Sequence, residues 1–341
     1  MPPYRAPWWL PGGHLQTIYP KFLLRQAPPP YRRERWATPD GDFIDLDWVD
    51  DDGPHSPLVA LFHGLEGESA SHYATALMRA LSRRRWRGVV VHFRGCSGEP
   101  NRLPRAYHSG DVDEIAWILR RLRALDATAP LFAAGVSLGG NALLKWLGRE
   151  RTSARAVVDA AAGVSAPVDL MTAGDLLSSG MNRLYGNHFL QTLKKKSLEK
   201  LASFPSLYDA DLVRNARTLR EFDNVVTAPL HGFRDTDDYW TRASSKPDLK
   251  LIEVPTLIVH ARNDPFLPGQ YLPGVNEVSA SVTLDYPEGG GHVGFASGPF
   301  PGNLEWLPER LLAFFSENIA KAANKNALTT EDAEDAEENQ K

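Results

Sequence analysis

The chain has a single cysteine, Cys96, among its 341 residues. One thiol cannot form an intramolecular disulfide, so the sequence excludes a disulfide framework and a metal site built on several cysteines. No apolar run reaches the roughly 18 residues that a membrane-spanning helix needs. The N-terminal stretch MPPYRAPWWLPGG also lacks the apolar core of a signal peptide. We therefore expect a cytoplasmic protein without an integral membrane segment.

Neither sign of charge dominates the chain. The net charge is -4 at pH 7 and the isoelectric point is near 6.2, so the whole-chain charge gives no reason to expect nucleic acid or an anionic membrane as a partner. The H-E-x-x-H metal motif is missing, and glycines 289–291 are not followed by the Lys-Ser/Thr of a phosphate loop. We expect no metal and no cofactor. The hydrophobic content of 43% suffices for a sizeable core.

One stretch, LFAAGVSLGGNALLKW at 131–146, carries a strong functional motif. An apolar strand at 131–134 runs into Gly135-Val136-Ser137-Leu138-Gly139, and an amphipathic helix follows. Strand, G-x-S-x-G and helix in this order predict a nucleophile elbow, which lifts a serine hydroxyl clear of the sheet. Gly135 and Gly139 suit this turn because a Cβ at either position would collide with neighbouring backbone.

Buried strands alternate with helices on both sides of this motif. Such alternation predicts an α/β fold with a mostly parallel, eight-stranded sheet and helices on both faces. We expect strands at 34–37, 43–48, 58–62, 89–93, 131–134, 156–164, 256–260 and 282–286. We expect helices at 73–83 and 111–125, after the elbow, and at 304–323. The first two strands form a hairpin around Pro39-Asp40-Gly41.

Three segments depart from this alternation. Residues 1–33 are rich in proline and aromatic residues, which opposes a helix and predicts an ordered arm packed on the core. Residues 166–248 read as a helical cap inserted over the carboxyl edge of the sheet, between core segments 34–165 and 249–323. Its helices are expected at 184–201, 207–222 and 235–243. Residues 324–341 form an acidic tail that we expect to be disordered.

An elbow serine needs a general base and an acid that orients the base. In this fold the acid and the histidine follow the serine along the chain, in that order. Asp264 lies directly after the expected strand 256–260, and His292 follows the expected strand 282–286. The sequence therefore predicts a catalytic triad of Ser137, Asp264 and His292.

Acyl transfer also requires two donors directed at the developing oxyanion. We expect the backbone N–H groups of Leu138, after the nucleophile, and of Leu65, in the loop after strand 58–62. Gly64 would allow a close approach of that loop, and the His63 side chain is expected to be structural.

Other residues leave alternatives open. Cys96 is a rival nucleophile, but its loop lacks the strand-to-helix turn. His108 is expected to be structural or to contact substrate. The apolar residues of 181–190 and 233–240 suggest either an acyl pocket or packing of the cap on the body.

Several motifs together resemble the YheT-like branch of the α/β-hydrolase superfamily. They are His14-Leu15-Gln16-Thr17, Pro39-Asp40-Gly41-Asp42, Phe62-His63-Gly64-Leu65-Glu66-Gly67, His92-Phe93-Arg94-Gly95-Cys96-Ser97-Gly98-Glu99, Tyr107-His108-Ser109-Gly110, Gly135-Val136-Ser137-Leu138-Gly139-Gly140-Asn141 and Gly290-Gly291-His292-Val293-Gly294. The resemblance implies an α/β-hydrolase fold and the same triad. That branch includes bacterial esterases and membrane-anchored eukaryotic lipases and phospholipases. The N-terminal anchor of the eukaryotic members is missing here, which favours a soluble carboxylesterase.

The expected activity is carboxylic ester hydrolysis through an acyl-enzyme, without a cofactor, on a small-molecule ester with a hydrophobic acyl group. Two alternatives share the fold: acyl transfer to an alcohol other than water, and a non-catalytic ligand receptor. Acyl chain length, physiological role and oligomeric state stay open.

Overall fold

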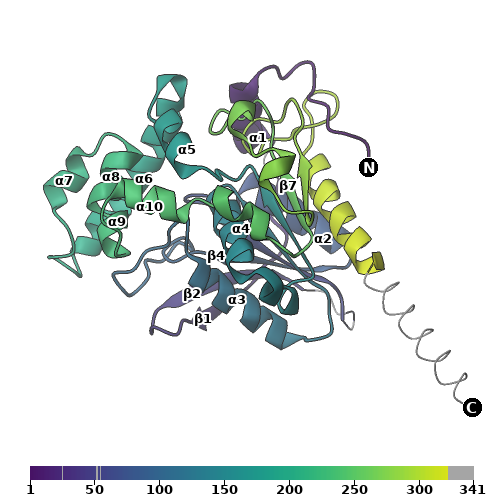
Figure 1. Ribbon diagram of the computed structural model, residues 1–341, viewed down its shortest axis with the longest axis horizontal. Coiled ribbons are helices and arrows are strands. Elements are labelled where there is room, and N and C mark those ends of the chain that lie inside the picture. The colour runs from purple at the N-terminus through teal and green to yellow at the C-terminus, as the bar shows by residue number, and fades with distance from the viewer. Residues whose placement is uncertain (25, 51–52, 54, 322–341) are drawn as a thin grey trace, which may run out of the picture.

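The computed structural model describes residues 1–24, 26–50, 53 and 55–321 and contains one eight-stranded sheet flanked by helices (Figure 1). The acidic tail expected at 324–341 lies outside the described residues. The strands are β1 (Arg32–Ala37), β2 (Phe43–Val49), β3 (Leu58–Phe62), β4 (Arg87–His92), β5 (Leu131–Val136), β6 (Ala160–Val164), β7 (Thr256–Val259) and β8 (Val282–Asp285).

The sheet is mostly parallel, as predicted. Its order is β1-β2-β4-β3-β5-β6-β7-β8, and only β2 runs against its neighbours. The six strands from β4 to β8 in this order are mutually parallel, so their carboxyl ends meet at one edge of the sheet. One strand begins later than expected: residues 151–156 form a 3₁₀ turn, and β6 starts only at Ala160.

Helices cover both faces of the sheet because successive strand side chains point to opposite sides. Ala60 of β3 and Ala133 of β5 share one core with α3 (Val112–Leu125) and α4 (Leu138–Glu150). Leu61 and Phe132, which are sequence neighbours of Ala60 and Ala133, pack with α2 (His72–Arg83) and the helix that starts at residue 306. The sheet is therefore held rigidly between two apolar layers.

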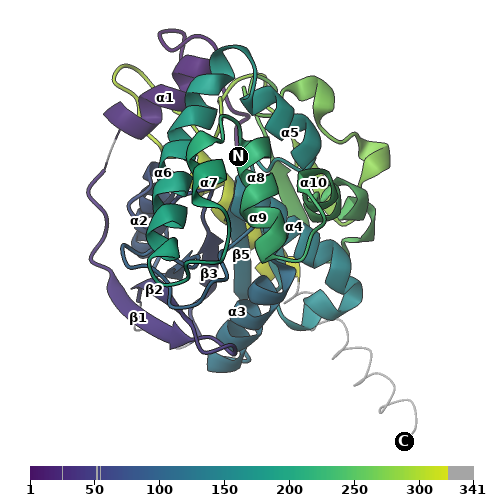
Figure 2. The same cartoon turned by 90° about the vertical axis from the view of Figure 1, so that its left-hand side faces the viewer.

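A group of helices, which we call the inserted helices, lies between β6 and β7. They are α5 (Leu170–Leu177), α6 (Arg183–Leu201), α7 (Ala210–Asn215), α8 (Leu219–Val225), α9 (Thr227–Leu230) and α10 (Thr236–Ala243). They gather on one side of the body (Figures 1 and 2). The single helix expected at 207–222 is wrong: Asp209 caps α7 and Thr218 caps α8, and Ala216 between them has a non-helical backbone. The short helices α5 and α9 were not expected.

The N-terminal arm contains a helix, contrary to the expectation from its prolines. α1 (Gly13–Leu23) begins after Pro11, and Pro20 lies inside it. The eight residues 12–19 between these prolines are free of proline, which leaves room for two helical turns. Proline density along the arm was thus a poor guide, because spacing between prolines decides whether a helix fits.

Candidate active site

Ser137 lies at the sharp junction of β5 and α4. Its backbone has φ 52° and ψ -120°, a conformation that costs a non-glycine residue about 1–3 kcal/mol. The Ser137 N–H donates to the carbonyl of Val164 at 2.8 Å, which ties the turn to β6. The side chain is partly exposed, so the strained turn presents the hydroxyl at the carboxyl edge of the sheet.

The two glycines of the motif are sterically required. A Cβ at Gly135 would lie 2.5 Å from the carbonyl oxygen of Gly139, and one at Gly139 would lie 2.5 Å from the carbonyl oxygens of Phe62 and His63. These clashing atoms belong to the main chain, which cannot move aside in the way that the end of a flexible side chain can. The space at Gly64 is tight but less restricted, because a Cβ there would lie 3.1 Å from Ser137 Cβ.

The structure brings Ser137, His292 and Asp264 together in one chain of hydrogen bonds. His292 Nε2 lies 3.0 Å from Ser137 Oγ, and His292 Nδ1 lies 2.9 Å from Asp264 Oδ2. Asp264 follows β7 and His292 follows β8, so adjacent parallel strands deliver the acid and the base to the edge where β5 delivers the serine.

The carboxylate of Asp264 is fully buried and held in its ionised form. Burial alone would raise its pKa, but the facing His292, together with hydrogen bonds from His260 and His292, lowers the pKa below its ordinary value. His260 Nε2 lies 3.2 Å from Asp264 Oδ2, and the Phe266 N–H donates to Oδ1 at 2.8 Å. His260 was expected only as the end of a strand; no motif marks it, since its role depends on the fold of the loop after β7.

The N-terminal arm supports the loops that carry the acid and the base. Thr17 Oγ1 accepts from the His292 N–H at 2.8 Å. Gln16 Oε1 accepts from the Gly290 N–H at 2.7 Å and from Asn263 Nδ2 at 2.9 Å. These contacts assign a structural role to Gln16 and Thr17 of the motif His14-Leu15-Gln16-Thr17, which the sequence indicated only as part of a resemblance.

The two residues predicted to supply oxyanion donors, Leu65 and Leu138, line the same cavity as Ser137. Leu138 is the first residue of α4, where backbone N–H groups have no partner within the helix. In the loop after β3, the N–H groups of Gly64 and Glu66 donate to the hydroxyls of Tyr73 and Tyr107 at 3.0 and 2.9 Å. Leu65 lies between them and, like Leu138, lines the cavity beside Ser137.

His63 is fully buried and bonded within its loop. Its Nδ1 lies 2.7 Å from the Gly64 carbonyl, and Nε2 accepts from the Phe93 N–H at 3.1 Å. Burial lowers the pKa of His63 to about 3, so the ring is neutral at pH 7. Its position under the loop matches a structural role.

A cavity of about 790 Å³ opens beside Ser137 and runs beneath the inserted helices. Apolar side chains from α5, α6, α8 and α10 form much of its wall, among them Leu177, Phe189, Leu193, Phe222, Tyr239 and Trp240. Some residues of the stretches 181–190 and 233–240 line this cavity, and others do not. Phe189 faces the cavity, whereas Leu190 packs among the inserted helices and Met181 is exposed.

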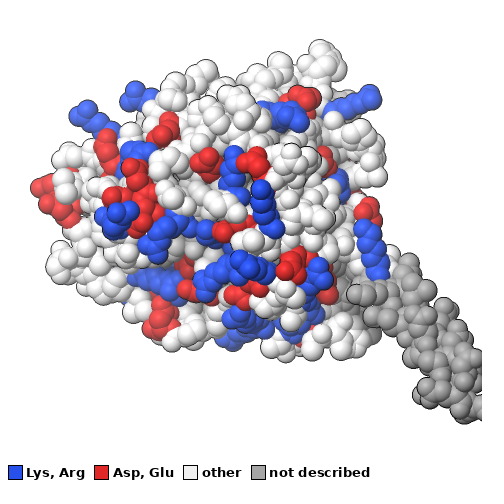
Figure 3. Space-filling model, in the orientation of Figure 1, with Lys and Arg blue, Asp and Glu red and all other residues white. Residues whose placement is uncertain are grey.

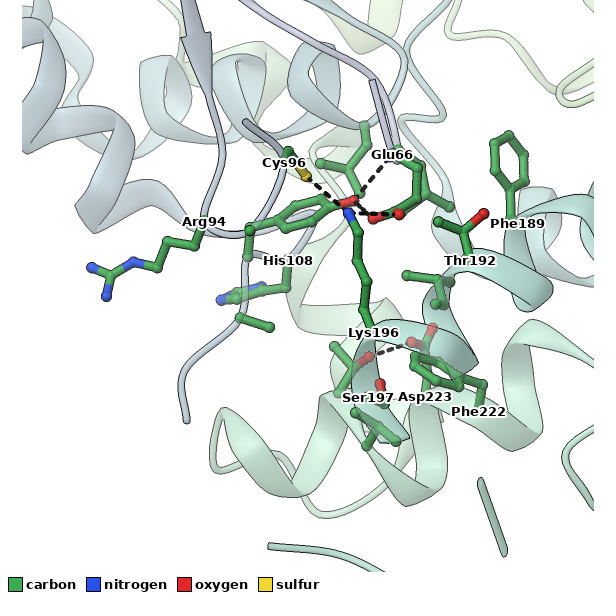
Figure 4. Close-up of a pocket in the computed structure, with 18 of the residues that line it drawn as sticks. Glu66, Arg94, Cys96, His108, Phe189, Thr192, Lys196, Ser197, Phe222 and Asp223 are labelled. Carbon is green, nitrogen blue, oxygen red and sulfur yellow. Dashed lines mark hydrogen bonds and ion pairs between the residues drawn. The ribbon is translucent and has the colours of Figure 1, made fainter. Parts of the chain in front are cut away.

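A charged pair crosses the cavity from α6 to the loop after β3 (Figure 4). Lys196 Nζ lies 2.8 Å from Glu66 Oε2, and the Tyr107 hydroxyl donates to Glu66 Oε1 at 2.8 Å. Lys196 Nζ also lies 3.7 Å from the Cys96 sulfur. Burial raises the pKa of the Cys96 thiol to about 12 despite this lysine, which disfavours the thiolate that a nucleophile requires.

His108 lines the cavity and lies next to His231, with ring centroids 4.3 Å apart and the rings tilted by 47°. Its Nδ1 accepts from the Gly110 N–H at 3.2 Å, and burial lowers its pKa. Both readings made from the sequence, structural and substrate-contacting, remain compatible with this place.

Within residues 1–24, 26–50, 53 and 55–321, no group of three or more His, Cys, Asp or Glu side chains could hold a metal ion. No helix in the same described part is long and apolar enough to cross a membrane.

Comparison with known proteins places the chain in a family. The model of the α/β hydrolase fold matches residues 57–299. The proposed esterase YheT of Escherichia coli K12 is 41% identical over 302 residues, covering 87% of this chain and 88% of YheT. The human phospholipase ABHD3 is 32% identical over 308 residues, covering 88% of this chain and 75% of the phospholipase.

Solved structures show the same fold at lower identity. Est1E from Butyrivibrio proteoclasticus with bound ferulic acid is 16% identical, with a TM-score of 0.53 and coverage of 86% of this chain and 100% of Est1E. The 2,6-dihydroxy-pseudo-oxynicotine hydrolase is 18% identical, with a TM-score of 0.56 and coverage of 86% of this chain and 69% of the hydrolase. The chain therefore belongs to the α/β-hydrolase family, in the branch that contains YheT.

Proposed function

We propose that this protein is a serine hydrolase of the carboxylesterase type, which cleaves carboxylic esters through an acyl-enzyme on Ser137. The observation that carries the proposal is the continuous relay from Ser137 Oγ through His292 to the buried Asp264, with links of 3.0 and 2.9 Å. The relay borders a large cavity with apolar walls. Similarity to an esterase and a phospholipase supports the same class of reaction.

The proposed reaction begins when Ser137 Oγ attacks the ester carbonyl while His292 Nε2 takes the hydroxyl proton. The carbonyl oxygen becomes an oxyanion that accepts hydrogen bonds from the N–H groups of Leu65 and Leu138. His292 then protonates the departing alcohol, and the acyl group remains on Ser137. A water molecule, deprotonated by His292, attacks the acyl carbonyl and releases the carboxylic acid. Asp264 holds the imidazole in the required tautomer and stabilises its charged form.

The substrate proposal rests on the cavity. A volume of about 790 Å³ exceeds what a short-chain ester fills, and the aromatic and aliphatic wall favours a hydrophobic acyl group. We therefore expect kcat/KM on p-nitrophenyl esters to rise from acetyl to longer acyl chains, because each buried methylene adds to binding.

The direct test is the Ser137→Ala variant. We expect kcat on p-nitrophenyl butyrate to fall on the order of 10⁴-fold with folding intact. A fluorophosphonate probe should label the wild-type chain and leave the variant unlabelled. Retained turnover in the folded variant would rule the mechanism out.

The same reagents separate the two alternatives. Labelling of Ser137 without turnover of any ester in a panel from short to long acyl chains would favour a ligand receptor. New esters formed when alcohols are added, detected by product analysis, would favour acyl transfer to an alcohol over hydrolysis. The cytoplasmic location expected from the sequence stays a prediction.

A further inference from the structure

Helix α1 packs a largely polar face against the rest of the protein and exposes an apolar face. Its buried residues are Gln16, Thr17 and Pro20, whereas Leu15 and Ile18 are 52% and 41% exposed. Side chains three or four residues apart share a helix face, so Leu15, Ile18 and Phe22 form one outward stripe. A helix that only had to pack on the core would bury such a stripe.

The stripe continues onto its neighbours, and together they form what we call the α1 face. Its members are Trp8, Leu15, Ile18, Phe22, Leu23, Met181, Leu184 and Phe300, eight of the 13 large apolar side chains that are exposed among the described residues. Trp8 is 91% exposed and Phe300 is 74% exposed. Scattered single apolar residues are normal on a surface, but a gathering of this kind marks an interaction site.

Contacts show that these segments are adjacent. The ring of Trp9, next to Trp8, lies 5.4 Å from that of Phe300. His14 of α1 lies 3.1 Å from the Tyr185 hydroxyl, in the first turn of α6, just after Leu184. Figure 2 shows α1 beside the upper part of α6.

Exposed basic side chains lie in the segments that carry the α1 face. Residues 1–24 contain no Asp or Glu, and their basic residues are Arg5 and Lys21. Arg5 and Lys21 are exposed, as is Arg183 at the start of α6. In Figure 3 the upper edge of the molecule, where α1 lies in Figure 1, is mostly white, with blue side chains and a red group beside them. The whole-chain charge of -4 conceals this local positive balance.

We propose that the α1 face docks on the surface of a lipid bilayer that carries anionic headgroups. Exposed tryptophan, phenylalanine and leucine side chains enter the boundary between headgroups and acyl chains, and arginine or lysine side chains at the rim meet the phosphates. The helix lies in the plane of the interface and does not span the bilayer.

The α1 face cannot turn inward to hide its apolar stripe. Gln16 and Thr17 hold α1 to the loops that carry Asn263 and His292, and the Tyr4 hydroxyl donates to the Ala296 carbonyl at 2.7 Å. Docking therefore needs no refolding of the arm, and it places the loop of His292 close to the bilayer. The proposal stands whether or not the chain hydrolyses esters.

The test is sedimentation of the full chain with vesicles of phosphatidylcholine containing roughly one-third phosphatidylglycerol. We expect wild-type protein to sediment with these vesicles and much less with phosphatidylcholine alone. The variant Trp8→Ser/Leu15→Gln/Leu23→Gln should lose at least about 10-fold in vesicle affinity. Its circular dichroism spectrum and its unfolding in urea should equal those of the wild type, which reports intact folding.

A matched control removes three exposed apolar side chains from other parts of the surface: Leu125→Gln/Leu212→Gln/Val275→Ser. This variant should bind vesicles as the wild type does. Wild-type protein that stays in the supernatant with anionic vesicles would overturn the proposal, and so would an equal loss in the control. A wild-type dimer in light scattering that the α1-face variant turns into a monomer would instead assign this face to a second copy of the chain.

Discussion

The hydroxyl of Thr17 accepts a hydrogen bond from the backbone N–H of His292 at 2.8 Å, across 275 positions of sequence. The same hydroxyl donates to the Gly13 carbonyl at 2.7 Å, so it is fixed on α1 from both sides. The N-terminal arm is thereby part of the support for the proposed general base.

Thr17→Val should impair the chemical step more than substrate binding. The variant keeps the shape of the side chain but removes the acceptor for the His292 N–H, which lets the histidine loop shift. We expect kcat on p-nitrophenyl butyrate to fall about 10-fold with KM nearly unchanged, since small misplacements of a reacting group are costly. Thr17→Ser, which retains the hydroxyl, should stay close to the wild type. Equal activity of the Thr17→Val and Thr17→Ser variants would show that this bond does not position the loop.

Lys196 and Glu66 should depend on each other. Lys196→Met would leave the Glu66 carboxylate, whose side chain is only 8% exposed, without its cation. A buried unpaired charge is strongly destabilising, and Glu66 adjoins the Leu65 N–H. We expect kcat to fall about 10-fold, because the proposed oxyanion donor moves with its loop.

The double variant Lys196→Met/Glu66→Gln tests this interdependence in a double-mutant cycle. Removing both charges should restore kcat to within about threefold of the wild type, because no unpaired charge is left. A double variant as impaired as Lys196→Met alone would mean that the lysine acts directly on the substrate.

Gly139→Ala should damage the fold as well as the activity. The new Cβ would lie 2.5 Å from two backbone carbonyl oxygens, those of Phe62 and His63. We expect a loss of about 3 kcal/mol or more in the free energy of unfolding, measured in urea. Gly180→Ala is the matched control, because Gly180 has φ 50° and nothing within 4 Å of its ideal Cβ. That substitution should cost only about 1 kcal/mol of backbone strain.

Asp223 should make the chain less stable as the pH rises from about 4 to about 6. Burial raises its pKa from 3.8 to about 6, although hydrogen bonds from Thr227 and Trp240 lower it in part. In this window Asp223 keeps its proton in the folded chain but has lost it in the unfolded chain. The stabilising contribution of the protonated side chain is therefore complete below about pH 4 and disappears as the pH passes 6.

The Asp223→Asn variant lacks this titration. We take the free energy of unfolding of the variant minus that of the wild type. This difference should increase by on the order of 2 kcal/mol between pH 4 and pH 7. Urea unfolding at several pH values, followed by circular dichroism, measures the difference. A constant difference over the whole range would mean that Asp223 titrates alike in the folded and unfolded chains.

Strands and the elbow were predictable because their signals are local. The apolar run 58–62 coincides with β3, and glycine at positions 135 and 139 reports a steric demand that arises within a few residues of backbone. The helix break between Asn215 and Thr218 was missed, since two N-caps, Asp209 and Thr218, outweigh a continuous apolar pattern. The helix α1 was not predicted, because the high proline content of the arm opposes a helix although the spacing of the prolines allows one.

The chain by itself determined the class of fold, the order of the serine, acid and histidine, and the loops in which they stand, because periodicity and glycine placement act over short distances. Only the tertiary structure decided that Thr17 and Gln16 brace the loop of His292, that His260 reaches Asp264, and that α1 turns its apolar side outward. Each of these depends on contacts between segments far apart in the sequence, whose geometry no local pattern encodes.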